Sequence, residues 1–351
     1  MAASALFKTA LDLLRLTGIT RLLRPVLGGK GVIFMLHHVR PAAPDGGFSP
    51  NGGLEVTPDF LDHVIALVNR LGYDCISLDE MVKRMASGER GGRPFACFTL
   101  DDGYRDNLVH GLPIFRRHRC PFAIYVAPAI ADGTCEIWWR GLEALIAKET
   151  RLEVEWAGER LALDCADSRG KLMAWRRLYW PLRQLDQHEQ RQWISQACAS
   201  HGIDLLGLCR AEAMNWDELR EISRDPLCTI GAHTIRHFAL ARLAEDEART
   251  EMSGSANRIA SELGRRPLHF AYPYGDFRSA SPREFRLARE LGFATAVTTR
   301  KGLIFDAHED HLTALPRLSL SGDYQKPRYV EVLLSGAPFL LFNGLRRVKT
   351  A

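Results

Sequence analysis

Two short motifs place carboxylates and imidazoles directly after apolar stretches of sequence. One strand-like run ends at Asp101 and Asp102, and a second run, much further along the chain, ends at His233 with His237 four residues on. A carboxylate and two imidazoles form the ligand set of an open catalytic zinc site, in which water completes the coordination. The sequence therefore predicts a catalytic metal site.

Each motif also has a purely structural interpretation. An Asp-Asp-Gly sequence after a strand commonly forms a turn, and two histidines four residues apart often do no more than satisfy hydrogen bonds on a helical face. The argument for a site is that both motifs follow apolar runs, because a metal needs ligands that converge from separate elements.

The apolar runs that precede these residues read as β-strands separated by helices. Thr57 is an N-cap followed by Pro58, and Ser281 begins a capping box with Glu284. Strands that alternate with helices in this way predict a parallel α/β fold. Eight runs are candidate strands: 32–36, 75–78, 95–100, 122–127, 227–232, 268–272, 294–298 and 315–320.

The polar residues that could take part in a reaction lie at a consistent place, just after a candidate strand. His37 follows the first run, Asp101 and Asp102 the third, His233 the fifth and Tyr274 the sixth. In a barrel of parallel strands the carboxyl ends share one face, where active sites are built. We therefore expect these side chains to meet.

One region interrupts the alternation. Residues from about 133 to 210 are rich in Trp, Arg and Leu at helical spacing, with one candidate strand pair within 152–163. We expect a helical insertion between two strands of a barrel domain that extends over residues 31–322. Trp138 and Trp139 are either a platform for sugar rings or core side chains.

The net charge of +4 is concentrated at the two ends of the chain. Residues 1–30 carry five Lys or Arg against one Asp, and residues 323–351 carry five against two acids. Each end also holds an apolar run, 11–23 and 337–345. The ends therefore either rest on an anionic membrane surface or pack on the domain. The middle has no basic groove with interleaved aromatic residues, which argues against nucleic-acid binding.

Cysteine usage and the N-terminal sequence both bear on the compartment. The eight cysteines form no C-x-x-C pair, which favours a reducing environment. No apolar run reaches the roughly 20 residues that span a bilayer, and Asp12 and Arg15 interrupt the N-terminal apolar positions, unlike a signal peptide. We expect a cytoplasmic protein, with peripheral contact at the inner face of the cell membrane as an extension of that prediction.

Three motifs, taken in order, resemble the polysaccharide deacetylase family, which shares the NodB homology domain. They are the TLDDG sequence at 99–103, HTIRH at 233–237 and AYPYG at 271–275. The resemblance extends roughly over residues 32–320. It implies a distorted (β/α) barrel of seven to eight parallel strands that removes acetyl, or formyl, groups from amino sugars or polysaccharides with a divalent metal. Zinc is the expected ion, with cobalt or nickel as alternatives.

The resemblance also implies a role for individual residues. Asp102, His233 and His237 would hold the metal, and Asp101 would be the general base that takes a proton from the attacking water. The backbone N–H of Tyr274 would stabilise the oxyanion, although an ordinary tight turn is the other interpretation of its motif. His37 ends the first strand where many relatives have histidine, and it is a further catalytic candidate.

Two positions depart from the family pattern. Ala271 stands where the family usually has an arginine that braces the catalytic aspartate, and the late Leu-x-His is replaced by Leu315-Pro-Arg317. Arg317 either replaces the missing arginine from another strand or makes a structural ion pair. His308 and His311 lie upstream in an expected loop, and the general acid is left without an assignment.

The resulting prediction is a metal-dependent hydrolase that removes an N-acetyl group, or an O-acetyl or formyl group, from an amino sugar, a polysaccharide or a lipid-linked glycan precursor. The alternative is a catalytically degenerate barrel that binds glycans or acts as a scaffold. Intact Asp101, Asp102, His233 and His237 argue against that alternative, because a cluster of ionisable groups is costly to keep together without use.

Overall fold

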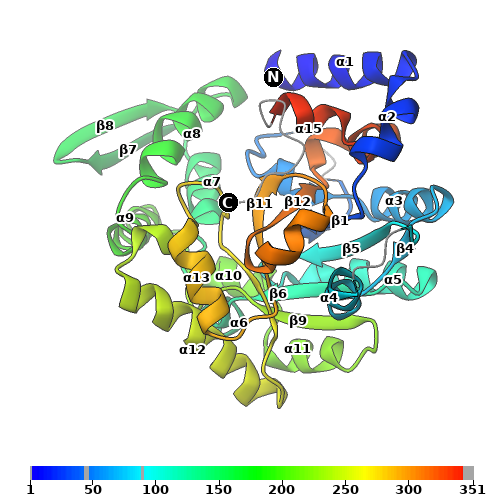
Figure 1. Ribbon diagram of the computed structural model, residues 1–351. Helices are drawn as coiled ribbons and strands as arrows, with labels where there is room; N and C mark the ends of the chain where they lie inside the picture. The colour runs from blue at the N-terminus through cyan, green and yellow to red at the C-terminus, as the bar shows by residue number, and fades with distance from the viewer. Residues whose placement is uncertain (1, 43–46, 88–90, 343–351) are drawn as a thin grey trace.

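The computed structural model describes residues 2–42, 47–87 and 91–342, and its centre is a closed barrel of seven parallel strands (Figure 1). Their order is β1, β12, β11, β10, β9, β6 and β5, and β5 pairs back onto β1 over its whole length. The barrel strands are β1 (Gly31–Leu36), β5 (Phe95–Leu100), β6 (Phe122–Val126), β9 (Cys228–Ala232), β10 (His269–Ala271), β11 (Thr295–Lys301) and β12 (Leu315–Ser319).

The predicted parallel barrel is therefore confirmed, with one strand assigned too long. The run 75–78 contributes only Cys75 to a strand, the last residue of β4 (Asp74–Cys75). The strand ends there because Ser77 caps the helix that starts at Leu78, accepting a hydrogen bond from Glu80 N at 3.1 Å. The strand β4 pairs with the first residues of β5. A short parallel pair, β2 (His38–Val39) and β3 (Glu55–Val56), lies outside the barrel.

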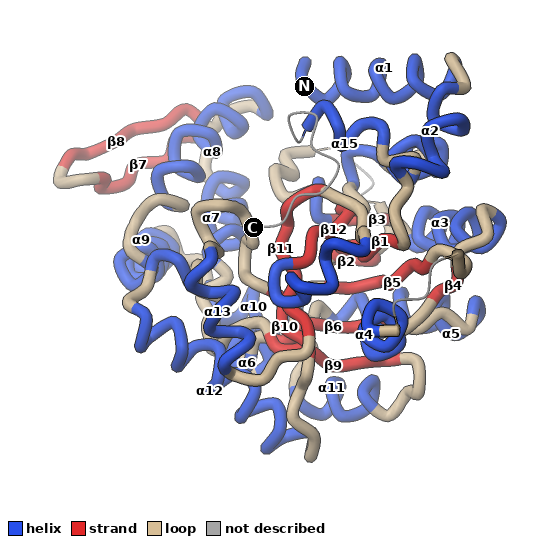
Figure 2. Tube along the Cα trace, viewed as in Figure 1, coloured by secondary structure: helices blue, strands red, loops and turns tan. Residues whose placement is uncertain are grey.

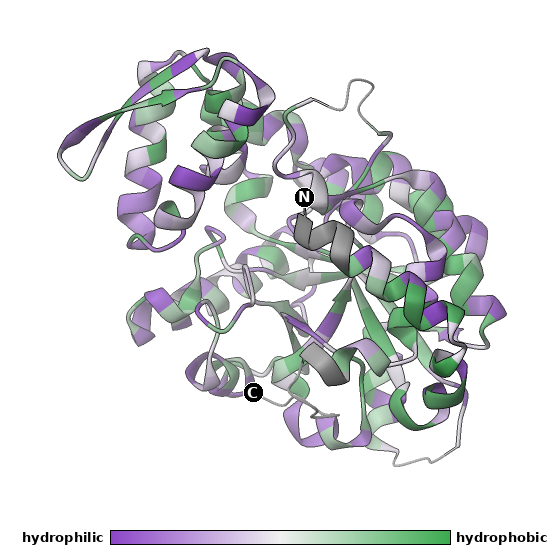
Figure 3. Cartoon of the chain, turned by 90° about the horizontal axis from the view of Figure 1, so that it is seen from above, coloured by the Kyte–Doolittle hydropathy of each residue, from purple (hydrophilic) through white to green (hydrophobic). Residues whose placement is uncertain are grey.

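Helices surround the barrel with their apolar faces inward. In Figure 3 the strands at the centre are hydrophobic, whereas the surrounding helices alternate hydrophobic and hydrophilic residues. The predicted capping at Thr57 and at Ser281 with Glu284 is present. The helices of this layer are α3 (Pro58–Arg70), α4 (Leu78–Ala86), α5 (Leu112–His118), α6 (Pro128–Ala131), α11 (Trp216–Ser223), α12 (Glu245–Leu263) and α13 (Pro282–Glu290).

The region between β6 and β9 forms a helical body with its own apolar core. Its antiparallel hairpin is the strand pair expected within 152–163, and it extends away from the barrel in Figure 2. Trp138 and Leu142 are fully buried in this core. The elements are α7 (Trp138–Lys148), β7 (Arg151–Trp156), β8 (Glu159–Asp164), α8 (Ser168–Leu182), α9 (Gln187–Ser200) and α10 (Leu205–Glu212).

The described parts of the two terminal segments lie together on one side of the barrel (Figure 1). They form α1 (Ala2–Leu16), α2 (Ile19–Leu27), α14 (Pro327–Leu334) and α15 (Ala337–Phe342). Leu11 packs on α14, and Arg328 donates a hydrogen bond to Asp12 at 2.7 Å. The predicted C-terminal segment lies partly outside the described residues, including its basic positions 346, 347 and 349. Among the helices that are described, none has both the length and the apolarity needed to cross a bilayer.

Candidate active site

The barrel brings the three predicted metal ligands together at the carboxyl ends of its strands. Asp102 follows β5, and His233 and His237 follow β9. The Oδ1 atom of Asp102 lies 3.4 Å from His233 Nε2 and 3.2 Å from His237 Nε2. One ligand atom of each residue lies within 4.8 Å of the others, and all three side chains are buried. The predicted convergence is thus present.

The donor set fits a divalent metal ion. Asp102 Oδ1 and His237 Nδ1 are buried and have no hydrogen-bond partner among the described residues, although buried polar atoms are normally paired. His233 Nδ1 lies 2.7 Å from the carbonyl oxygen of Ala271. If Nδ1 carries the proton and donates it there, Nε2 presents its lone pair beside Asp102. Two imidazoles and a carboxylate suit zinc and similar ions.

The electrostatic state of these ligands also suits metal binding. Burial lowers the pKa of His237 to about 4, so its imidazole is neutral at neutral pH. Burial raises the pKa of Asp102, but the two imidazoles beside it, those of His237 and His233, outweigh burial and hold that pKa well below its usual value. A neutral imidazole and an ionised carboxylate are the forms that coordinate metals.

Backbone strain is concentrated in this site. Six non-glycine residues of the described chain have positive φ, and four of them are Asp102 (74°), Thr234 (58°), His237 (56°) and Tyr274 (61°). Such conformations cost about 1–3 kcal/mol each and cluster where a structure holds reactive groups in place. The strain agrees with a functional site rather than with ordinary turns.

Asp101 is held by a buried arginine from β12. Arg317 donates two hydrogen bonds to its carboxylate, Nη1 to Oδ1 at 2.7 Å and Nη2 to Oδ2 at 2.6 Å. Arg317 Nε donates to Thr298 O at 2.9 Å, and only 1% of the residue is exposed. Burial raises the pKa of Asp101, but the guanidinium outweighs it and lowers the pKa below its usual value. Arg317 thus occupies the bracing role that Ala271 cannot fill.

The two adjacent histidines after β1 point in different directions, as expected for consecutive residues of an extended chain. His37 Nε2 lies 3.9 Å from Asp101 Oδ2, which places His37 in the site. His38 instead contacts Asp106 at 2.6 Å and stacks on Tyr104 with ring centroids 3.6 Å apart. Burial lowers the pKa of His37, which the nearby aspartates oppose.

Tyr274 lies at the edge of the triad, and the helical insertion holds its side chain. Its ring is 4.8 Å from that of His237, and its hydroxyl accepts a hydrogen bond from Trp138 Nε1 at 2.7 Å. The guanidinium of Arg183 lies 3.7 Å from its ring centroid. The backbone N–H of Tyr274 has no acceptor within the described part of the chain. Sequence reasoning placed Tyr274 in the site but gave no signal for Arg183.

Two tryptophans at the start of the insertion, Trp138 and Trp139, are core residues. Trp138 is fully buried and Trp139 is 6% exposed, so their interpretation as an open sugar platform is wrong for this conformation. Trp139 Nε1 donates to the hydroxyl of Tyr104 at 3.3 Å, and its ring lies 4.8 Å from His237. Trp139 therefore lies against the triad, and Trp138 contacts Tyr274, which borders the triad. His308 is fully buried and accepts a hydrogen bond from Phe305 N at 3.0 Å.

Comparison with known proteins agrees with this geometry. A family model described as polysaccharide deacetylase matches residues 185–296, which include both histidines but neither Asp101 nor Asp102. No curated protein sequence matches the chain. The family match and the solved structures described next confirm the resemblance to the polysaccharide deacetylase family.

The solved structures show the same barrel fold at low identity. The Streptococcus pyogenes deacetylase PplD, in complex with acetate, is 17% identical with a TM-score of 0.57 over 86% of this chain and 96% of that chain. IcaB from Ammonifex degensii is 16% identical with a TM-score of 0.53 over 87% and 98%. A de-N-acetylase from Aggregatibacter actinomycetemcomitans is 13% identical with a TM-score of 0.54 over 86% and 98%.

The two adjacent aspartates should separate metal binding from chemistry. Asp102→Ala should remove the bound ion, because it deletes the only carboxylate of the triad, whereas Asp101→Asn should retain about one ion per chain. Elemental mass spectrometry of the purified proteins measures this. Asp310→Ala, at an exposed position, is the control and should match the wild type. Equal metal loss in both site variants would contradict the assignment.

Removing the guanidinium of Arg317 should leave Asp101 buried and unpaired. Arg317→Gln should therefore lower the free energy of unfolding by about 3–5 kcal/mol, which urea unfolding measures. It should also raise the pKa of Asp101, so the acidic limb of the kcat/KM profile should move to higher pH. Arg317→Lys keeps the charge but not the paired geometry, so its free energy of unfolding and its acidic limb should lie between those of the wild type and Arg317→Gln. An acidic limb at the same pH in all three proteins would contradict the bracing role.

Proposed function

We propose that the protein is a metal-dependent hydrolase that removes N-acetyl groups from amino sugars of a glycan. The observation that carries the proposal is the buried Asp102, His233 and His237 triad beside a second carboxylate, Asp101, that Arg317 holds in place. Three protein ligands, next to a carboxylate that is tied to another partner, are what amide hydrolysis at a metal requires.

The ligands and the base have distinct tasks. A divalent ion held by Asp102, His233 and His237 supplies a Lewis acid that polarises the acyl carbonyl and makes water more acidic. Asp101 accepts a proton from the attacking water. Its position is fixed because Arg317 bonds both carboxylate oxygens. Proton acceptance by a positioned carboxylate typically contributes about 10²–10⁴-fold to rate.

His37 is our assignment for the proton donor that the sequence left open. Its Nε2 lies 3.9 Å from Asp101 Oδ2, close enough for a small adjustment to bring them into contact. Because burial keeps His37 neutral, it must first receive the proton that Asp101 accepts and then give it to the leaving nitrogen. The carbon–nitrogen bond breaks, the carbon–oxygen bond forms, and the proton moves from water to the amine.

Tyr274 stabilises the negatively charged oxygen that develops on the acyl carbon. Its backbone N–H is available as a donor, and its positive φ turns that N–H away from regular strand pairing. Gly275 is required beside it, since a Cβ there would lie 2.6 Å from Thr299 N. The contacts of Trp138 and Arg183 with the Tyr274 side chain keep this backbone N–H in place. Hydrogen-bond donors that are fixed in advance lower the activation barrier.

The substrate class follows from the family match, and finer details extend the proposal. The family description names polysaccharides, and one related structure is a de-N-acetylase. We propose zinc as the ion, with cobalt or nickel as alternatives, because two imidazoles and a carboxylate suit these ions. Action in the cytoplasm on a lipid-linked precursor remains our proposal from the cysteine usage and the basic, apolar ends of the chain. O-acetyl or formyl groups are the alternative leaving acyl groups.

Acetate release from N-acetylglucosamine oligosaccharides tests the proposal. The wild-type protein should release acetate, chelation should abolish release, and zinc, cobalt or nickel should restore it. Asp101→Asn should lower kcat by about 10²–10⁴-fold with metal retained. No release from any acetylated glycan by a protein that holds its metal would favour the degenerate glycan-binding barrel.

His37→Gln separates the proton donor from a structural role. It should lower kcat by about 10²–10⁴-fold with little change in KM or metal content, and loss should be smaller for substrates whose leaving group needs no proton, such as an activated aryl acetate. His63→Gln, at an exposed position on α3, is the control. Equal losses for both substrate types would reject the proton-donor role.

A further inference from the structure

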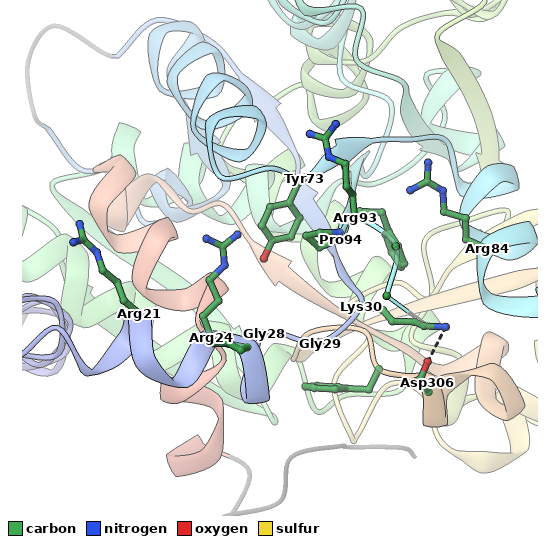
Figure 4. Close-up of a pocket in the computed structure, with 15 residues that line it drawn as sticks. Arg21, Arg24, Gly28, Gly29, Lys30, Tyr73, Arg84, Arg93, Pro94 and Asp306 are labelled. Atoms are coloured by element: carbon green, nitrogen blue, oxygen red, sulfur yellow. Dashed lines mark ion pairs between the residues drawn. The ribbon is translucent and has the colours of Figure 1, made fainter. Parts of the chain in front are cut away.

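A second hollow lies far from the catalytic groups, at the opposite end of the barrel. It is a cavity of about 680 Å³ beside the amino ends of β1 and β5, whereas the metal ligands follow the carboxyl ends of β5 and β9. Figure 4 shows Arg21 and Arg24 of α2 on one side and Arg93 and Arg84 on the other, with Tyr73 between them. We call this the basic cavity; Lys30 completes its set of cations.

The charges in the basic cavity are only partly balanced. Lys30 pairs with Asp306 at 2.7 Å, and Arg84 and Arg93 share Asp74 at 2.9 and 3.2 Å, while Arg84 also pairs with Glu80 at 3.3 Å. The two arginines of α2 have no carboxylate partner among the described residues. Arg24 donates to the carbonyl oxygen of Leu71 at 2.9 Å and lies 5.2 Å from the ring centroid of Tyr73. The cavity thus keeps an excess of positive charge.

Large apolar side chains are exposed on the same pair of helices. Of eleven exposed large hydrophobic residues in the described chain, five lie within residues 13–26. We call them the apolar row: Leu13 (58% exposed), Leu16 (82%), Ile19 (41%), Leu22 (78%) and Val26 (56%). Residues three or four apart share a helical flank, so Ile19, Leu22 and Val26 form a stripe along α2. Exposed apolar groups in a cluster mark an interaction surface.

We propose that the apolar row and the basic cavity together form a docking surface for an anionic lipid bilayer. A helix with apolar side chains on one flank and arginines on another is suited to lie in the plane of the interface. There the leucines enter the acyl boundary, and Arg21 and Arg24 meet lipid phosphates. The cavity beside α2 gives a headgroup phosphate a site among several cations. This surface goes beyond the deacetylase proposal and does not depend on it.

Charge decides against the other occupants. A second copy of the chain seated on the apolar row would cover those side chains but would leave the excess positive charge of the basic cavity unmatched. A soluble phosphate would fill the basic cavity but would leave the apolar row in water. An anionic bilayer satisfies both parts. Docking there would not place the bilayer against the catalytic groups, because they follow the opposite ends of the strands.

Vesicle flotation of the full-length protein tests the proposal. The protein should float with vesicles of phosphatidylcholine and phosphatidylglycerol, far less with phosphatidylcholine alone, and less as salt is added. Arg21→Ala with Arg24→Ala should weaken binding about 30-fold, and Leu16→Ser with Leu22→Ser about 100-fold. The matched controls carry exposed residues of the same types elsewhere: Arg176→Ala with Arg177→Ala, and Val109→Ser with Met173→Ser, which should bind as the wild type does.

Each other result overturns the proposal. One is no binding to anionic vesicles, or equal loss in the site and control variants. Another is a protein that does not bind vesicles and is a dimer by light scattering, and that becomes a monomer in the Leu16→Ser, Leu22→Ser variant. That result would make the apolar row an interface between copies of the chain. The third is binding of inorganic pyrophosphate that requires Arg21 and Arg24 without any vesicle binding, which would identify a soluble ligand. Circular dichroism spectra identical to the wild type establish that each variant is folded.

Discussion

The paired hydrogen bonds between Arg317 and Asp101 are the interaction on which the arrangement of the site depends. Both side chains are almost fully buried, and removing two charges from water costs several kcal/mol per ion unless geometry and further hydrogen bonds compensate. Here Arg317 also donates to Thr298 O and to Thr99 Oγ1, at 2.9 and 3.1 Å. An apolar pair of the same size would stabilise the barrel equally well, so the ion pair is best explained by the carboxylate it positions.

That pair exists only because the barrel closes. Asp101 follows β5 and Arg317 belongs to β12, and these strands are not neighbours: β1 lies between them and pairs with both. The pair therefore spans β1, and Thr99 strengthens the junction by donating to the carbonyl oxygen of Phe34 at 2.7 Å. The ends of β9 and β5 lie near each other for a different reason: β6 lies between these two strands and pairs with both, and this strand order positions the candidate metal ligands.

Local patterns in the sequence predicted the strands and the convergence of Asp102, His233 and His237, because both signals are short. An apolar run that ends on Asp102 or His233 indicates a strand end, and strand ends of a parallel barrel meet. The partner of Asp101 could not be chosen in this way: 216 positions separate it from Arg317 in the chain, and their contact depends on the register of three strands. The contacts of Arg183 and Trp138 with Tyr274 were equally invisible, since the packing of the insertion on the barrel leaves no periodic signal.

The ends of the chain show why composition could not choose between packing and membrane contact. One flank of α1 packs inward, where Leu11 is 1% exposed and Asp12 bonds Arg328 of α14. The next residue, Leu13, and Leu16 one turn further on are 58% and 82% exposed. A helix with two apolar flanks is compatible with both packing on the barrel and membrane contact. The inner flank fixes the helix to the barrel, and the outer flank then stays exposed beside the arginines of α2.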